Sequence, residues 1–371
     1  MQGSLRQRQN LKGRNMLSGT SAAMQYGYSS ARVKAMEAEL ITKKAMQEIM
    51  NAKDISSMLA VLFQGDYRSE IESFGGLSIK QELIDFALSK NLARSSTKLV
   101  QISPTTERKI VRGIVGKWDL YNIKLALEAK GRKSDYESIA GFVVDFGRYN
   151  AAAIKEAMRE ESIEGMMNRF MMNSPYSAML KSALESYKKS KDIAEAIAEI
   201  DKGYYKELGN IILGLRIRHN ESALMVKMDI DMKNLMLLIK GKRAGLKFPE
   251  VSPYIVEHGR MSLAELEQLY NGTKDIEALV SQVKLYDLKG ALEVYRSGKR
   301  KQLLVFEIGM KNAIFNESLR MLKHSILSIG AVLAYSYLKE IEIYTLRIII
   351  HGRIYGLTRE EMERLIVWRN E

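Results

Sequence analysis

The stretch WDLYNIKL at residues 118–125 returns as IDMKNLML at 230–237 and again as IEIYTLRI at 341–348. The second position of each copy is acidic (Asp119, Asp231 and Glu342), and these residues are 112 and then 111 positions apart. A second element, GRYN at 147–150, recurs 112 residues later as GRMS at 259–262, and its third copy would fall at the C-terminal end of the chain. Each repeat is as long as a common single domain. The period therefore predicts three related structural units.

The period also suggests where the units begin and end. We expect a basic leader at 1–25 and repeat units at 26–141, 142–255 and 256–371. The first 36 residues contain six basic residues and no acidic one, a composition that predicts a flexible leader. This leader has no apolar segment of the kind found in secretory signals.

The composition favours helices along the whole chain. Only 4 of the 371 residues are proline, and Met, Leu, Ile, Ala, Lys and Glu dominate. Such residues are good helix formers, whereas a sheet-rich fold needs more turn residues. Apolar or small residues at a spacing of three to four, as over 31–49, indicate amphipathic helices. We therefore predict an all-α fold made of three pseudo-symmetric helical bundles.

Charge and cysteine content narrow the classes of function. The chain has no cysteine, which excludes disulfides, cysteine-ligated metals and thiol catalysis. Its net charge of +13 predicts attraction to an acidic partner such as nucleic acid, anionic lipid or an acidic protein.

The longest uncharged candidate for a membrane span, 325–338, has 14 residues. A spanning helix needs about 20 apolar residues, so this stretch is predicted to be a buried helix.

The repeated helix has a wide apolar surface and one polar side. Counted from the acidic residue, positions +1, +4 and +8 are apolar, which predicts that the helix is largely buried. Gly241 and Gly352, each followed by a cation, are predicted helix C-caps, with Ala129 in the first copy. The acid and the residue at +3 share one side of the helix. They are interpreted either as a structural acid near a helix N-terminus or as a polar stripe that lines a shared opening.

Signatures of catalysis, cofactors and metal binding are absent from the sequence. The glycine pairs lack the spacing of a phosphate loop, and the four histidines lack metal-ligand spacing. One acid in each otherwise apolar repeat is typical of a structural position, because general acid–base catalysis usually needs paired groups. We therefore expect no catalytic residue, no cofactor, no metal and no small-molecule substrate. Asn150 and Ser262, after the Gly-Arg pairs, are predicted helix N-caps.

Several motifs resemble one family in their order and spacing. These are YGYSSARVKAM at 26–36, the first copy of the repeat at 118–124, NSPY at 173–176, the Tyr204-Tyr205 pair, LKEIEIYTLRII at 338–349 and GLTREE at 356–361. Together they resemble the C subunit of archaeal-type (A-type) ATP synthases and its eukaryotic relative, the d subunit of the vacuolar ATPase. The resemblance covers about residues 26–371. The basic leader, Ala129 in place of glycine and Thr345 in place of asparagine depart from the pattern.

The resemblance implies a funnel of three helical bundles without an active site. A protein of this kind sits on the proteolipid ring at the cytoplasmic face of the membrane, as a peripheral protein. It receives the central axle subunits of the D and F types and transmits torque between ion flow and ATP chemistry. The positive charge would then face anionic headgroups or acidic loops of partners. Five residues are the candidates for the partner-binding wall of the funnel: Asp119, Asp231, Glu342, Asn122 and Asn234.

Two other classes of protein fit parts of the pattern. A basic helical repeat scaffold that binds nucleic acid would also be positively charged and non-catalytic, but it should show a basic stripe in every repeat. The column Lys124, Met236 and Arg347 is not uniformly basic, which counts against it. An enzyme with an unfamiliar helical site would need polar residues concentrated in one unit, and the sequence shows no such concentration. The rotary-ATPase subunit is therefore the preferred hypothesis, and no nucleic acid is expected as a partner.

Overall fold

The chain consists of helices and connecting loops wherever the structure describes it. The structure is a computed structural model that describes residues 26–73, 81–105, 107–215, 220–298, 301–325 and 328–367. No β-strand occurs within these ranges, so the predicted all-α class is confirmed. The predicted leader at 1–25 lies outside the described residues. In the same ranges no helix combines the length and apolarity required to cross a bilayer.

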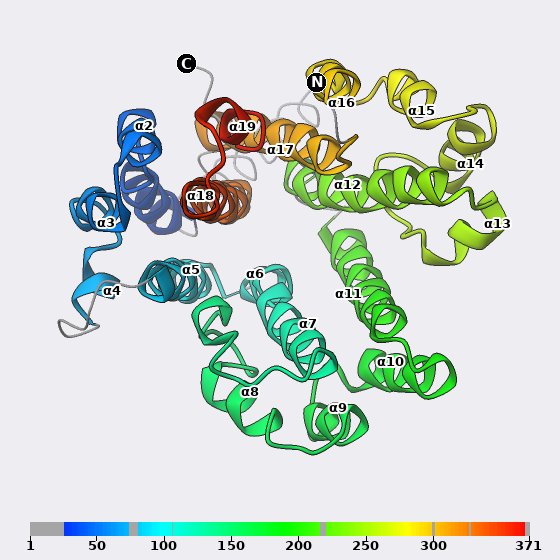
Figure 1. Cartoon of the computed structure of the whole chain (residues 1–371), viewed down its shortest axis with the longest axis horizontal. Helices are drawn as coiled ribbons and strands as arrows, with labels where there is room; N and C mark the ends of the chain where they lie inside the picture. Colours follow the sequence, from blue (N-terminus) through cyan, green and yellow to red (C-terminus); the bar gives the residue numbers. More distant parts are fainter. Residues whose placement is uncertain are drawn as a thin grey trace, which may run out of the picture.

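The helices follow one another around the molecule in Figure 1, and the last ones return to the first. After a helical segment at 26–38 come α2 (Lys43–Asn51), α3 (Ile55–Phe63), α4 (Arg68–Glu72) and α5 (Gln81–Ile102). The next group is α6 (Arg108–Val115), α7 (Lys117–Gly131), η1 (Ala140–Phe142), α8 (Ala151–Ala157), α9 (Ile163–Met171), α10 (Ser177–Ser190) and α11 (Ile193–Leu215). The third is α12 (Asn220–Ala244), α13 (Phe248–Val251), η2 (Ser252–Tyr254), α14 (Leu263–Asn271), α15 (Ile276–Gln282) and α16 (Lys289–Ser297). The chain closes with α17 (Leu304–His324), α18 (Gly330–Ile354) and α19 (Arg359–Glu363).

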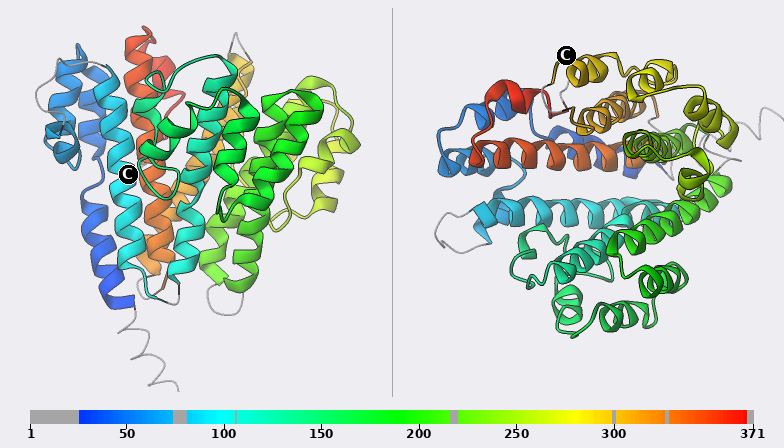
Figure 2. Two further views of the ribbon diagram at one scale, coloured as in Figure 1. Left: turned by 90° about the horizontal axis from the view of Figure 1, so that it is seen from below. Right: turned by 45° about the vertical axis from the view of Figure 1, so that its right-hand side comes forward.

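Long helices form the inside of the molecule, and short helices cover its outside. In Figure 2 the long helices α5, α7, α11, α12, α17 and α18 stand alongside one another. The three copies of the repeated segment lie on α7, α12 and α18. Each is followed in the chain by short helices or a loop, so each repeated helix is enclosed on more than one side. This enclosure explains the wide apolar surface seen in the sequence.

In the part of the chain that the structure describes, the buried apolar side chains form two clusters, and the smaller one joins the two ends of the chain. It packs Ile49, Leu62 and Leu88 from the N-terminal helices against Leu346 and Met362 from α18 and α19. The larger cluster runs from the helical segment at 26–38 and the end of α5 through the helices from α6 to α18. Since burying an aliphatic side chain stabilises a fold by about 1.5–3 kcal/mol, the shared cluster holds the two chain ends together.

The third copy of the Gly-Arg element has its structural counterpart at the N-terminus. Asn150 and Ser262 cap α8 and α14, accepting hydrogen bonds from Ala153 N (3.1 Å) and Glu265 N (3.3 Å) as predicted. Thr42 caps α2 in the same way, through Ala45 N at 3.2 Å. From the sequence, the third copy of the Gly-Arg element was expected at the C-terminal end. The expectation failed because the third unit is completed by residues from the N-terminus, and a repeat that is divided between the two ends of the chain cannot be recognised by its spacing. The unit boundaries at 26–141, 142–255 and 256–371 stay a prediction.

The predicted caps at Gly241 and Gly352 are wrong, since both glycines lie inside their helices. The left-handed residue that ends each repeated helix comes four positions later, at Lys133 (φ 57°), Gly245 (φ 71°) and Gly356 (φ 73°). The residue after it donates back into the last turn, as from Leu246 N to Gly241 O at 3.0 Å. Gly241 is needed for close packing instead: a Cβ there would meet Val251 Cγ2 at 2.7 Å.

Candidate functional site

Each repeated helix holds a loop in place through its buried acid. The carboxylate of Asp119 accepts hydrogen bonds from Tyr149 N at 2.8 Å and from the Tyr176 hydroxyl at 3.2 Å. Asp231 accepts from Arg260 N (3.0 Å), Met261 N (3.2 Å) and the Tyr286 hydroxyl (2.5 Å). In both copies the acid therefore binds two things. One is the main chain of the loop that precedes a short helix, and the other is the hydroxyl of a tyrosine that follows later in the chain. We call this arrangement a socket.

The third socket is assembled from the two ends of the chain. Glu342 accepts from Ile41 N at 2.6 Å, across 301 positions of sequence, and from the Tyr67 hydroxyl at 2.5 Å. Ile41 precedes the cap Thr42 just as Tyr149 precedes Asn150, so the three sockets are equivalent. Lys339, only 1% exposed, adds a third donor at 2.7 Å. Its ammonium also lies 3.2 Å from Asp66 Oδ2.

Glycine is required where the first two loops pass their acids. A Cβ at Gly147 would lie 2.5 Å from Asp119 Oδ1, and one at Gly259 would lie 2.2 Å from Asp231 Oδ1. Gly147 also has φ +73°, a conformation that other residues rarely adopt. The repeated Gly-Arg pairs of the sequence are thus explained by close approach of the loop to the carboxylate.

The residue at +3 grips the same loops. Asn122 donates to Val144 O (2.7 Å) and Tyr149 O (2.9 Å) and accepts from Val144 N at 2.9 Å. Asn234 makes the matching pair with Val256, donating to its carbonyl at 2.8 Å and accepting from its N–H at 2.9 Å. An amide side chain can make this two-point contact because it carries a donor and an acceptor side by side.

The cation near the end of each repeated helix binds the end of the next short helix. Lys130 donates to Met158 O at 3.2 Å and Lys242 to Thr273 O at 2.5 Å. Arg353 donates in the same way to Ala52 O at 2.8 Å, again between the two ends of the chain. These carbonyls lie at helix ends, where the dipole favours a positive charge. Each repeated helix is thus joined to its outer helices at two levels, through its acid and through the cation near its C-terminal end.

The five residues predicted to line a funnel are all buried, within 7% exposure, at these sockets: Asp119, Asp231, Glu342, Asn122 and Asn234. Their polar atoms bind the chain's own loops, which supports the structural interpretation of the acids. The sequence predicted that each acid lies near a helix N-terminus. This holds for Asp119, in the first turn of α7, whereas Asp231 and Glu342 lie near the middle of their helices. Contact of the five with a partner stays a prediction.

Burial dominates the electrostatics of the sockets. It raises the pKa of Asp119 and of Asp231, although the hydrogen bonds from their loops work in the opposite direction. Burial beside these carboxylates also raises the pKa of Tyr176 and Tyr286 far above the usual range. The tyrosines therefore stay neutral and act as hydrogen-bond donors.

A different set of equivalent positions in the three repeated helices brings these helices together. The residues two positions before the acids are Lys117, Asp229 and Glu340. Lys117 forms an ion pair with Glu340, and Tyr337 donates to Asp229 Oδ2 at 3.4 Å. Burial and the charge of Glu340 raise the pKa of Asp229 despite the attraction of Lys117. We call these three residues the central cluster.

Lys117 and Glu340 of the central cluster begin a half-exposed face on α7 and α18, while Asp229 at the same position of α12 is buried. The face continues at +2 and +5, one turn apart, and its half-exposed members are Tyr121, Lys124, Lys233, Tyr344 and Arg347. Lys124 and Lys233 both pair with Asp201 of α11, the former at 2.6 Å. These cations keep the pKa of Asp201 low against the effect of burial. Sequence reasoning missed this face because it followed the recurring acid, while the residue types at −2 differ between copies.

Neither the sockets nor the central cluster has the composition of a metal site. Within the described ranges, no three His, Cys, Asp or Glu residues are grouped so that they could hold an ion. The acids instead accept from main-chain N–H groups, tyrosines and lysines. What this geometry can do chemically is to fix loops onto helices and helices onto one another.

Comparisons with known proteins agree with this architecture. A family model described as "ATP synthase (C/AC39) subunit" matches residues 29–365. A protein of Thermoplasma acidophilum, named as the C subunit of an A-type ATP synthase, is 23% identical over 350 residues, which cover 91% of this chain and 97% of the relative. Proteins of the same name from Thermococcus kodakarensis and Methanocaldococcus jannaschii are 25% and 24% identical. Each match covers 92% of this chain. It covers 90% of the Thermococcus kodakarensis protein and 86% of the Methanocaldococcus jannaschii protein.

Proposed function

The chain belongs to the C/AC39 family of ATP synthase subunits, and we propose that it is the non-catalytic central-stalk (rotor) subunit of an A-type ATP synthase. In this proposal it sits as a peripheral protein on the proteolipid ring, at the cytoplasmic face of the membrane. It holds the axle subunits of the D and F types and transmits torque between ion translocation and ATP synthesis or hydrolysis.

One observation carries the proposal: the three repeated helices are joined to one another and to their outer helices by buried polar contacts. A part that transmits torque must resist twisting. Each socket would have to leave two or three buried donors unpaired before its helix could slide, at about 1–3 kcal/mol for each donor. The threefold arrangement of sockets, closed between the two chain ends by Glu342, suits a stiff ring of helices.

The half-exposed face is the part of the repeated helices that we propose for contact with the axle. It carries the half-exposed acid Glu340 and the cations Lys117, Lys124 and Lys233, which form ion pairs with Glu340 or with Asp201 of α11, so it presents charges of both signs. Charges at such a contact steer a partner and fix its orientation. The five buried residues of the sockets would then act on the axle only through the face that they support.

The net charge of +13 gives the proposal a further element. A ring-bound protein works next to phospholipid headgroups, and a basic protein is attracted to an anionic surface within about a Debye length. We propose that part of the positive charge serves this attraction. Binding would then weaken as salt concentration rises.

The test is purification of the tagged chain from gently solubilised membranes, followed by mass spectrometry. We expect proteolipid and axle subunits in a fixed ratio. Lys233→Glu on the half-exposed face should lose the axle subunits and retain proteolipid, whereas Lys181→Glu on the outer helix α10 should lose neither. Circular dichroism confirms that both variants are folded. Recovery of nucleic acid without membrane-sector subunits would overturn the proposal in favour of a basic repeat scaffold.

A further inference from the structure

The three sockets differ at their +3 residue, where the third copy carries threonine. Asn122 and Asn234 each clamp the main chain of a valine 22 positions later, Val144 or Val256. The same interval from Thr345 leads to Val367, which is also buried. A threonine side chain is shorter than asparagine and has no amide group. It cannot make the same two-point contact with Val367.

The hydroxyl of Thr345 is buried without a hydrogen-bond partner in the described part of the chain. The residue is 1% exposed, and its Oγ1 makes no such bond. A buried hydroxyl without a partner costs about 1–3 kcal/mol, so the native fold should supply one. Asn122 and Asn234 are satisfied by their loops, so the orphan group is particular to the third socket.

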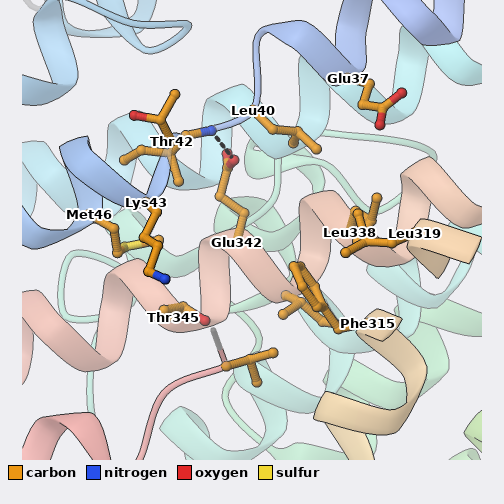
Figure 3. A pocket seen from close by; sticks show the side chains of 13 residues that line it. Glu37, Leu40, Thr42, Lys43, Met46, Phe315, Leu319, Leu338, Glu342 and Thr345 are labelled. Carbon is orange, nitrogen blue, oxygen red and sulfur yellow. Dashed lines mark hydrogen bonds between the residues drawn. The ribbon is translucent and has the colours of Figure 1, made fainter. Parts of the chain in front are cut away.

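A pocket of about 60 Å³ lies beside this hydroxyl. Its polar lining includes Thr345 and Glu342, and Ile41 and Val367 contribute from the two ends of the chain. Figure 3 shows Glu342 and Thr345 on α18, facing the segment that carries Thr42 and Met46. Glu37, Thr42 and Lys43 also line the pocket, and Phe315 and other apolar side chains form the rest of the wall. The pocket therefore sits where the asparagine amide and its loop meet in the other two sockets.

We propose that this pocket is a site for ordered water, which bridges the Thr345 hydroxyl to the main chain of Val367 and Ile41. Threonine plus water then takes the place of the asparagine side chain. One water needs about 10–15 Å³ of such space and two to four polar partners. The pocket is large enough for two or more, and the hydroxyl, the Glu342 carboxylate and the two main chains supply partners.

The bridge matters because the third socket is the joint between the two ends of the chain. Glu342 holds the N-terminal side by direct contacts to Ile41 and Tyr67. The C-terminal side, at Val367, is held through water in place of an amide. Water-mediated contacts exchange with solvent and allow local opening. The stretch around Val367 should therefore open more readily than its counterparts at Val144 and Val256.

The test is amide hydrogen exchange measured by NMR on the whole chain and on two variants. In the wild type we expect Val367 to exchange faster than Val144 and Val256, which serve as controls in the same molecule. Thr345→Asn should displace the water, restore the direct clamp and slow exchange at Val367 at least tenfold. Thr345→Val keeps the shape, removes the hydroxyl and should speed exchange there and lower Tm.

Two results would overturn the proposal. One is unchanged exchange at Val367 in a folded Thr345→Asn variant. The other is a Thr345→Val variant as protected and as stable as the wild type, since this would mean that the pocket is dry. Unchanged exchange at Val144 and Val256 in both variants shows that each is folded, so a general loss of structure cannot imitate either result. A crystal structure at high resolution with ordered water in contact with Thr345 Oγ1 would directly support the bridge.

Discussion

Replacing Asp231 by alanine separates the interpretations of the recurring acid. Asp231 is fully buried and accepts from two main-chain N–H groups, of Arg260 and Met261, and from the Tyr286 hydroxyl. Its removal leaves three donors in a site that water reaches poorly. We expect the loop at 259–262 to lose its ordered conformation and the free energy of unfolding to fall by a large amount.

The size of the effect follows from the contacts. Each unsatisfied buried donor costs about 1–3 kcal/mol, which gives an upper bound of about 9 kcal/mol for the three. Relaxation of the loop recovers part of this, and the variant no longer bears the cost of burying the carboxylate, which is shown by its raised pKa. Breaking a comparable buried network costs about 3–5 kcal/mol. We therefore expect Asp231→Ala to destabilise the chain by about 3–5 kcal/mol.

The assay is urea unfolding at neutral pH, followed by far-UV circular dichroism. Asp231→Asn should show an intermediate loss, because its carbonyl can still accept from the loop while its amide faces the Tyr286 hydroxyl. Glu267→Ala, at an exposed position of α14, is the control and should change stability little. A loss of about 1 kcal/mol or less for Asp231→Ala would refute the reasoning, because three buried donors left without an acceptor must cost more than that.

Two further predictions concern a loop glycine and the central cluster. Gly259→Ala should cost more than about 2 kcal/mol in urea unfolding, since its Cβ would lie 2.2 Å from the Asp231 carboxylate. Gly290→Ala, in α16 with nothing within 4 Å of the new Cβ, should be neutral or stabilising, and equal losses for both variants would contradict the close-approach argument. Asp229 has a pKa raised in the folded state, so the folded chain retains a proton that the unfolded chain releases. Its contribution therefore falls as pH rises from about 4 through the folded pKa. Asp229→Asn should accordingly be more stable than wild type at pH 7. Urea unfolding from pH 4 to 7 measures this, and a variant less stable than wild type at pH 7 would disprove it.

The helical class and the repeat could be read from the sequence because both depend on local patterns. Helix formers with few prolines predict helices, and apolar residues at +1, +4 and +8 predict their burial. The caps Asn150 and Ser262 were also predictable, since a short polar side chain after glycine satisfies the first turn of a helix through its own neighbours. The caps at Gly241 and Gly352 failed because a glycine may serve packing as well as a left-handed turn, and only the neighbouring helix decides which.

The sequence by itself determined that three similar buried helices each carry one acid, because burial and periodicity are written along a single segment. Only the tertiary structure decided what each acid binds. Glu342 takes its partners from Ile41 and Tyr67, across most of the chain, and no local pattern encodes that pairing. The structure also decided that the column of Lys117, rather than that of Asp119, brings the helices together. A helix that is apolar almost all round gives little sign of which side meets which neighbour, so that choice is made only when the whole molecule packs.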